Sequence, residues 1–200
     1  AWGIRREHVV VLFMARIHPV KGADKLVDAF LKIARIYPSA MLVMAGPDEF
    51  GLVESLKSRA AASGLTERVI FPGMVSGELK QQLLSRADLF CLPSDAEGFS
   101  MAILEALAAS TPVLISPGCH FDEVAGAGAG VIAEATADAF ASALAGLLGD
   151  RSRLRVMGQA GRELVKQRYT WPRIAEEVEA AYEEGIQRGL SREQGGLALR

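Results

Sequence analysis

The sequence predicts an α/β fold: a doubly wound, parallel, six-stranded Rossmann-like sheet in three α/β/α layers. First, short apolar runs alternate with longer amphipathic stretches along the chain, a pattern typical of βαβ units. Second, most of the apolar runs lack apolar/polar alternation, which indicates strands covered on both faces. Third, the 200 residues fit one domain, because domains commonly contain about 100–200 residues.

Six apolar runs are expected to form the strands, joined by right-handed crossovers. They lie at residues 9–15, 41–45, 69–71, 89–92, 113–115 and 131–133. The stretches between them have helical spacing, as in the apolar stripe of Leu26, Ala29, Phe30 and Ile33. Helices are therefore expected at residues 22–36, 51–63, 77–86, 101–109 and 136–148, with two more near 151–168 and 171–187.

The chain is expected to be one domain at residues 9–188, with a linker remnant at 1–8 and a flexible tail at 189–200. Only eight residues precede the first expected strand, which favours a domain cut from a longer protein. The net charge of -2 argues against a general electrostatic grip on nucleic acid, which needs a basic surface.

The lengths of the apolar runs and the number of cysteines indicate the cellular location to expect. No apolar run approaches the roughly 18 residues needed to span a bilayer. Cys91 and Cys119 are too few for a disulfide scaffold, so a reducing, cytoplasmic setting is expected. Peripheral association of a parent protein with a membrane stays open.

Chemistry should gather where the strands end, because ligands bind outside the carboxyl ends of the strands in such sheets. Arg16 and Lys21 follow the first strand, and Gly22 opens the next helix. Two cations at this turn can hold a diphosphate from two directions. From these residues alone, two solvated loop charges are an equal alternative.

Residues 93–100 form a second candidate segment. Gly98 permits close backbone approach, and the unpaired N–H groups of the helix that follows attract a phosphate or sugar oxygen. Glu97 can accept hydrogen bonds from sugar hydroxyls. In the structural alternative, Glu97 only favours the helix dipole, and Ser94 or Ser100 is an N-cap.

Glu105 is the single charged residue of the apolar helix expected at 101–109. A buried carboxylate needs hydrogen-bonding partners, which ribose hydroxyls, a backbone N–H or Arg16 would supply. Glu97 and Glu105, on a glycine-bearing loop and the helix after it, are together a sharper signal than either alone. No metal site is predicted, since the three histidines show no metal-ligand spacing.

Taken together, these segments resemble the C-terminal domain of GT-B glycosyltransferases of the glycosyl transferases group 1 kind. The resemblance covers roughly residues 9–187. It is carried by residues 15–22, 45–48, 71–75, 93–100, 104–108, 112–113 and 169–171. The chain departs from the family pattern at Ser110, where Gly is usual, and at Ser100-Met101-Ala102, where Gly-Leu-Pro is frequent.

The resemblance implies a retaining transferase that moves a sugar from a nucleoside-diphosphate sugar to an acceptor, with no cofactor and no required metal. By resemblance, Arg16 and Lys21 bind the donor diphosphate and stabilise the leaving group, and Glu97 holds sugar hydroxyls. Glu105 would take the ribose hydroxyls. The other donor-binding positions would be Gly46, Met74, Val75, Gly98, Phe99, Ser100 and Met101. An N-terminal acceptor domain of the parent chain would be the partner, and the chain alone would be inactive.

Two other function classes compete with this interpretation. One is a non-catalytic nucleotide-sugar-binding module without a partner domain. The other is a nicotinamide-dependent dehydrogenase domain, which needs a glycine fingerprint after the first strand. Residues 16–19 (Arg-Ile-His-Pro) lack that fingerprint, and the glycine-rich run at 126–130 precedes a strand instead of following one.

Overall fold

The computed structural model describes residues 2–197 of the chain. It divides into two compact units, one ending at Leu164 and the other beginning at Val165. The first unit contains the whole sheet and is the one that positions the candidate site. The expected domain limits at residues 8 and 188 stay a prediction.

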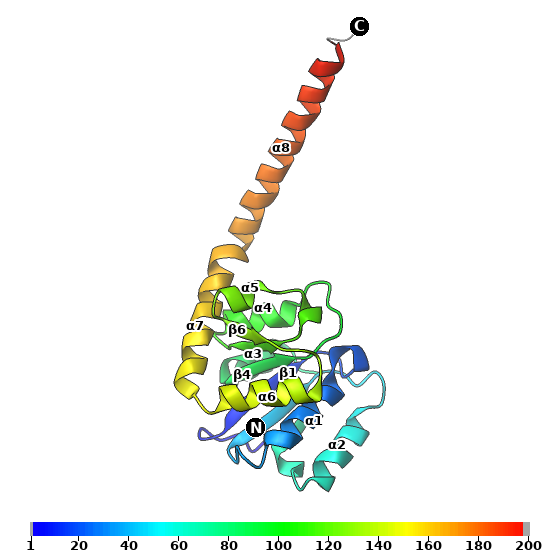
Figure 1. Ribbon diagram of the computed structural model, residues 1–200, viewed down its shortest axis with the longest axis vertical. Coiled ribbons are helices and arrows are strands. Elements are labelled where there is room, and N and C mark those ends of the chain that lie inside the picture. The colour runs from blue at the N-terminus through cyan, green and yellow to red at the C-terminus, as the bar shows by residue number, and fades with distance from the viewer. Residues whose placement is uncertain (1, 198–200) are drawn as a thin grey trace. The chain divides into compact units, whose positions relative to one another are not determined.

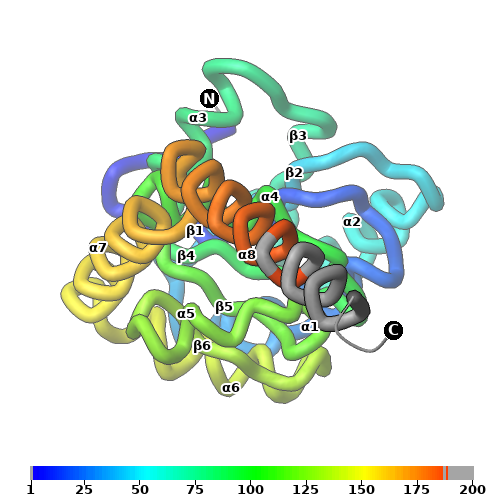
Figure 2. The backbone as a smooth tube through the Cα atoms, turned by 90° about the horizontal axis from the view of Figure 1, so that it is seen from above, coloured from blue at the N-terminus to red at the C-terminus, as the bar shows by residue number. Residues whose placement is uncertain are grey.

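The sheet has six parallel strands in the order β3-β2-β1-β4-β5-β6, and Figure 2 shows them in this sequence across the molecule. The strands are β1 (Val9–Met14), β2 (Ala40–Ala45), β3 (Val69–Gly73), β4 (Leu89–Leu92), β5 (Val113–Ile115) and β6 (Gly130–Ile132). Every residue of β1, β2, β4 and β5 is buried. The predicted fold class is confirmed, since continuous apolar runs form strands covered on both faces.

Helices cover both faces and complete the three layers (Figure 1). The helices are α1 (Ala23–Ile33), α2 (Val53–Ala62), α3 (Gly77–Arg86), α4 (Met101–Ala108), α5 (Glu123–Gly126), α6 (Ala137–Leu148), α7 (Arg151–Arg168) and α8 (Trp171–Leu197). Helix α1 packs against α6 on one face, and α3 packs against α4 on the other. The apolar stripe of α1 is buried at Leu26, Phe30 and Ile33, as its spacing predicts.

Short elements differ from the expectation. The four-residue helix α5 and the 3₁₀ turns at Pro19–Lys21, Thr66–Arg68 and Pro117–Cys119 are too brief to give a periodic pattern. The last helix runs to Leu197, ten residues past the expected 187. Residues 198–200 of the expected tail lie outside the described residues. None of the described helices combines the length and apolar character that crossing a membrane requires.

Arg68 joins the ends of α1 and β2 inside the first unit. Its guanidinium donates hydrogen bonds to the carbonyls of Ala34, Tyr37 and Ala40 at 2.6–2.9 Å and lies 5.7 Å from the Phe30 ring centre. Burial lowers the pKa of this guanidinium from its ordinary value. Arg68 thus satisfies backbone acceptors where the chain enters the sheet, which buried carbonyls require.

Candidate functional site

The sheet reverses its strand order between β1 and β4, and ligands of open α/β sheets bind outside the carboxyl ends of strands at this point. The loops after these two strands touch. Gly22 has φ +68°, and a Cβ there would come within 2.2 Å of the Pro93 carbonyl oxygen. Asp95 also donates its backbone N–H to the Val20 carbonyl at 2.8 Å. The segments holding Lys21 and Glu97 are therefore fixed side by side.

A pocket of about 320 Å³ lies at the carboxyl ends of β1 and β2. Gly46 allows it to form: at φ +149°, a Cβ would meet the Ala15 carbonyl oxygen at 1.8 Å. Six predicted site residues line this pocket, namely Arg16, Gly46, Met74, Val75, Met101 and Glu105. The fold thus brings together positions from four separate segments of the sequence.

Lys21 and Glu97, on the loops that follow β1 and β4, form a largely buried ion pair. Lys21 Nζ lies 2.6 Å from Glu97 Oε1, and the two side chains are only 15% and 10% exposed. The Glu97 backbone N–H donates to the Gly118 carbonyl at 2.8 Å, which holds the loop in place. A predicted phosphate cation and a predicted sugar acceptor are therefore adjacent, and each is the other's partner.

Glu105 is half-buried and its partner is Lys80 of α3. Lys80 Nζ lies 2.6 Å from Glu105 Oε1, with both side chains 33% exposed. The pair also lines a second pocket, of about 510 Å³, between α3 and α4. Arg16, a partner considered from the sequence, pairs with Glu49 at 2.8 Å instead.

Helix α4 presents a first turn without a side-chain cap. Ser100 is its N-cap residue, yet its side chain makes no capping hydrogen bond. Ser94 is buried, and its Oγ lies 3.0 Å from the Val20 carbonyl oxygen, so it fixes the loop and caps nothing. The leading N–H groups of α4 therefore stay available for an anion or a sugar oxygen. Gly98 has open space where a side chain would be.

The two cysteines lie behind this edge of the sheet. Cys91 is in β4 and Cys119 follows β5, and both are buried free thiols. Burial raises the pKa of both thiols, and for Cys119 hydrogen bonds with Ser116 oppose part of this effect. Neither thiol has the exposed, electropositive surroundings of a reactive cysteine. Among the side chains that the structure describes, no group of three or more is suited to a metal ion.

Sequence reasoning missed Lys80 and Glu49. Lys80 lies on a surface helix 25 residues before Glu105, and one charge among the several polar residues of α3 gives no signal. Glu49 follows the Gly46-Pro47-Asp48 turn, so its place at a strand end was the one available hint. Gly98, Phe99 and Ser100 lie in the loop before α4 but do not line the described pocket.

Comparison with known proteins assigns this arrangement to a family. The model of the family described as "Glycosyl transferases group 1" matches residues 1–164. The chain belongs to this family. It is 37% identical over 164 residues to D-inositol 3-phosphate glycosyltransferase of Nocardia farcinica, covering 78% of this chain and 36% of that protein. It is 33% identical over 178 residues to a GDP-mannose-dependent phosphatidylinositol monomannoside mannosyltransferase of Mycobacterium tuberculosis, covering 84% and 46%.

Solved structures of group 1 and related transferases share the fold. The C-terminal domain of a group 1 protein from Francisella tularensis superposes with a TM-score of 0.74 at 22% identity, over 82% of this chain and 87% of that one. Sucrose-phosphate synthase of Thermosynechococcus elongatus gives 0.79 at 25% identity, over 92% and 47%. The architecture of the chain is therefore that of the GT-B Rossmann-like domain. The chain spans less than half the length of the two curated relatives described above.

Proposed function

We propose that this chain is the donor-binding domain of a retaining glycosyltransferase that moves a sugar from a nucleoside-diphosphate sugar to an acceptor. The observation that carries the proposal is one edge of the sheet that combines cations, carboxylates and a helix N-terminus. Arg16 and Glu105 line the pocket there, and the Lys21–Glu97 pair lies on the loops that follow β1 and β4. A nucleoside-diphosphate sugar needs all three kinds of group.

Each of these residues is assigned to one part of the donor. Arg16 and Lys21 hold the diphosphate and disperse the charge on the departing nucleoside diphosphate, with the N–H groups of α4 as further donors. Glu97 accepts hydrogen bonds from sugar hydroxyls, and Glu105 from the ribose. Gly46, Met74 and Val75 border the base, since they line the β2 and β3 side of the pocket. Gly98, Phe99, Ser100 and Met101 supply backbone contacts to sugar and phosphate oxygens.

Binding requires an exchange of partners. Lys21 and Glu97 are paired, as are Lys80 and Glu105. Breaking a largely buried pair is costly when either ion is left alone. A donor that gives its phosphate to the lysine and its hydroxyls to the glutamate satisfies both ions. The site therefore favours a ligand that carries phosphate and hydroxyls together over one that carries phosphate alone.

A binding experiment would identify the nucleotide base and the sugar of the donor. One relative is named as GDP-mannose-dependent, and a fold neighbour from Anabaena is described in complex with UDP and glucose. Calorimetric titration of the chain with GDP-mannose, UDP-glucose and the free diphosphates would identify the donor. We expect one nucleotide sugar to bind more tightly than its free diphosphate, with affinity unchanged by a metal chelator. Failure of every nucleotide sugar to bind would overturn the proposal.

We further propose that the chain alone transfers no sugar. Alignment of an acceptor against the donor carbon supplies a large part of the rate of a two-substrate reaction, and here it is assigned to an N-terminal domain of the parent. Radiolabelled donor incubated with the chain and a range of acceptors should give no product. Activity that returns only with the parent's N-terminal region would support this division, and sustained transfer without it would refute it.

A further inference from the structure

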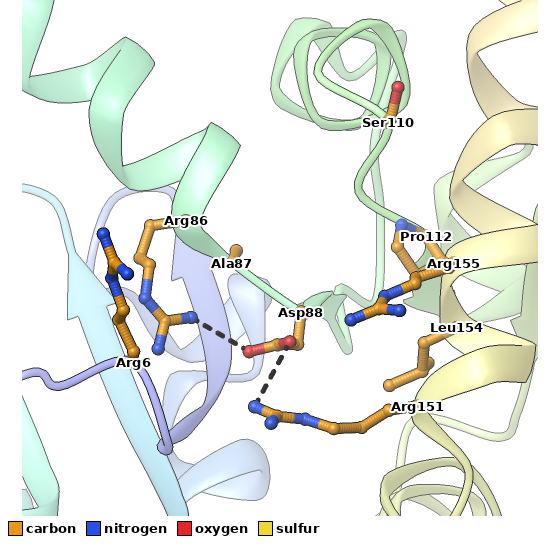
Figure 3. A pocket seen from close by; sticks show the side chains of 9 residues that line it. All are labelled: Arg6, Arg86, Ala87, Asp88, Ser110, Pro112, Arg151, Leu154 and Arg155. Atoms are coloured by element: carbon orange, nitrogen blue, oxygen red, sulfur yellow. Dashed lines mark hydrogen bonds and ion pairs between the residues drawn. The ribbon is translucent and has the colours of Figure 1, made fainter.

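A third pocket, lined by charged side chains, opens at the amino ends of the strands, the edge opposite the candidate site (Figure 3). Its lining includes Arg6 before β1, Asp88 before β4, Pro112 before β5 and the first turns of α7. Its volume of about 200 Å³ lies below the roughly 300–1,000 Å³ of sites for drug-sized ligands. The pocket therefore suits a small ligand.

Positive charge dominates this pocket. Four arginines line it, namely Arg6, Arg86, Arg151 and Arg155, against one acid, Asp88. Asp88 is already engaged by the protein: Oδ2 accepts the Val10 N–H at 2.8 Å and Arg86 at 3.1 Å. Its Oδ1 lies 3.6 Å from Arg151. One carboxylate with these partners cannot neutralise four guanidiniums.

Two of the four arginines are held by the backbone. Arg86 donates to the carbonyls of Arg5 and His8 at 2.7 and 2.9 Å, and Arg151 donates to the His8 carbonyl at 2.7 Å. Figure 3 shows both meeting Asp88 from different sides. These contacts make Arg86 and Arg151 a fixed framework for the pocket.

The other two arginines have no such role. Within the described residues, Arg6 and Arg155 make no hydrogen bond or ion pair, and both are exposed. In Figure 3, Arg155 extends from α7 toward Asp88, and Arg6 lies beside Arg86. Each guanidinium carries five N–H donors in a planar fork that matches phosphate oxygens. The pocket thus combines a fixed framework with two uncommitted phosphate-binding groups.

We propose that this pocket binds a phosphate monoester, at a site separate from the sugar-donor edge. A dianionic phosphate would lie between Arg6 and Arg155, with Arg86 and Arg151 adding charge from the framework. The same chemistry fits a soluble phosphate ester and the headgroup of a monoester phospholipid. The experiment therefore has one arm for each source.

The first arm is a titration of the ¹⁵N-labelled 200-residue chain with inorganic phosphate at constant ionic strength, followed by two-dimensional NMR. We expect saturable shifts of the backbone amides of Asp88, Thr111 and Arg155. The double variant R6Q/R155Q should weaken this binding at least tenfold while keeping the thermal midpoint of unfolding. R153Q is the matched control, because Arg153 is an exposed arginine of the same helix that does not line the pocket.

Phosphate bound at the donor edge would instead shift the amides of residues 98–101, and R6Q/R155Q would leave that binding unchanged. The proposal is overturned if the amides at the amino edge show no saturable shift. It is also overturned if R153Q weakens binding as much as R6Q/R155Q does, since the effect would then be general charge screening.

The second arm is co-sedimentation with phosphatidylcholine vesicles containing phosphatidic acid, compared with vesicles of equal charge containing phosphatidylglycerol. Preference for phosphatidic acid that is lost in R6Q/R155Q would assign the site to a lipid headgroup. Saturable binding of inorganic phosphate without vesicle binding would assign it to a soluble monoester. Vesicle binding that survives in R6Q/R155Q, with no phosphate shift at the amino edge, would refute the site.

Discussion

The two edges of the sheet carry positive charge in opposite ways. At the carboxyl edge, three cations are each paired with an acid: Arg16 with Glu49, Lys21 with Glu97 and Lys80 with Glu105. At the amino edge, Asp88 is shared by Arg86 and Arg151, and Arg6 and Arg155 have no partner among the described residues.

This difference has a consequence for selectivity. A ligand at the carboxyl edge must replace both members of an ion pair, so phosphate alone leaves a glutamate without a partner, which is costly when that glutamate is buried. A ligand at the amino edge breaks no pair. We therefore expect the carboxyl edge to discriminate strongly for a sugar nucleotide, and the amino edge to accept a phosphate group with little regard to what it is attached to.

The largest effect should come from Gly46→Ala, which disturbs the backbone on which the carboxyl edge is built. The added Cβ would lie 1.8 Å from the Ala15 carbonyl oxygen at a φ of +149°, so β1 and β2 must move apart at their ends. We expect a loss of about 3 kcal/mol or more in the free energy of unfolding, measured by urea denaturation. Gly98→Ala is the control, since open space surrounds that position, and it should change stability by less than about 0.5 kcal/mol. Equal stability of the two variants would contradict the packing argument.

The next prediction tests whether Lys21, a cation of a largely buried ion pair at the carboxyl edge, binds the nucleotide sugar. Lys21→Gln should weaken nucleotide-sugar binding by roughly 10–100-fold, because a charge-assisted hydrogen bond to phosphate is worth about 1.5–3 kcal/mol. Lys25→Gln is the matched control: Lys25 pairs with Asp95 at 2.5 Å in a more exposed position, and it should change affinity by less than threefold. Calorimetry on both variants decides this. Equal losses would mean that the edge acts through its overall charge.

A smaller effect is expected from Glu105→Gln, which keeps the shape of the side chain and removes its charge. Affinity for the nucleoside diphosphate should fall about tenfold, since an amide is a weaker acceptor for ribose hydroxyls. A double-mutant cycle with Lys80→Met separates the two roles of the glutamate. Coupling that appears in the unfolding free energy but not in the affinity would show that the carboxylate is only structural.

The sequence could predict the elements that repeat a pattern. Residues 77–86, 89–92, 113–115 and 151–168 were expected with the same bounds that the structure has. Long apolar runs and helical spacing are local signals, so they can be recognised in the sequence without knowledge of the fold. The strand ends follow from the strands, and Arg16, Gly46 and Met74 at these ends line one pocket. Val75 and Met101, which line the same pocket, were expected only from the family resemblance.

Partners across the sequence could not be predicted. Lys80 with Glu105, Arg16 with Glu49 and Arg68 with three separate carbonyls depend on how helices and loops meet in space. The arginine pocket is the clearest case, because its four arginines come from three segments between residues 6 and 155. No spacing in the sequence brings them together.

The last and smallest effect is a dependence of stability on pH that arises from the two buried thiols behind the candidate site. Cys91 lies in β4 and Cys119 follows β5, and burial raises the pKa of both thiols. A thiol in the unfolded chain ionises near about pH 8.5, while the folded protein keeps its protons. Stability is therefore complete below that pH and falls as pH rises toward the pKa of the folded state. Between pH 7 and pH 8.5, with a reductant present, we expect the free energy of unfolding to fall by up to about 0.8 kcal/mol, because each of two thiols is half-ionised in the unfolded chain at the higher pH. The variant C91A/C119A should be less stable at both pH values but should lose this fall. An equal fall in the stability of that variant would show that other groups, and not the two thiols, cause the pH dependence.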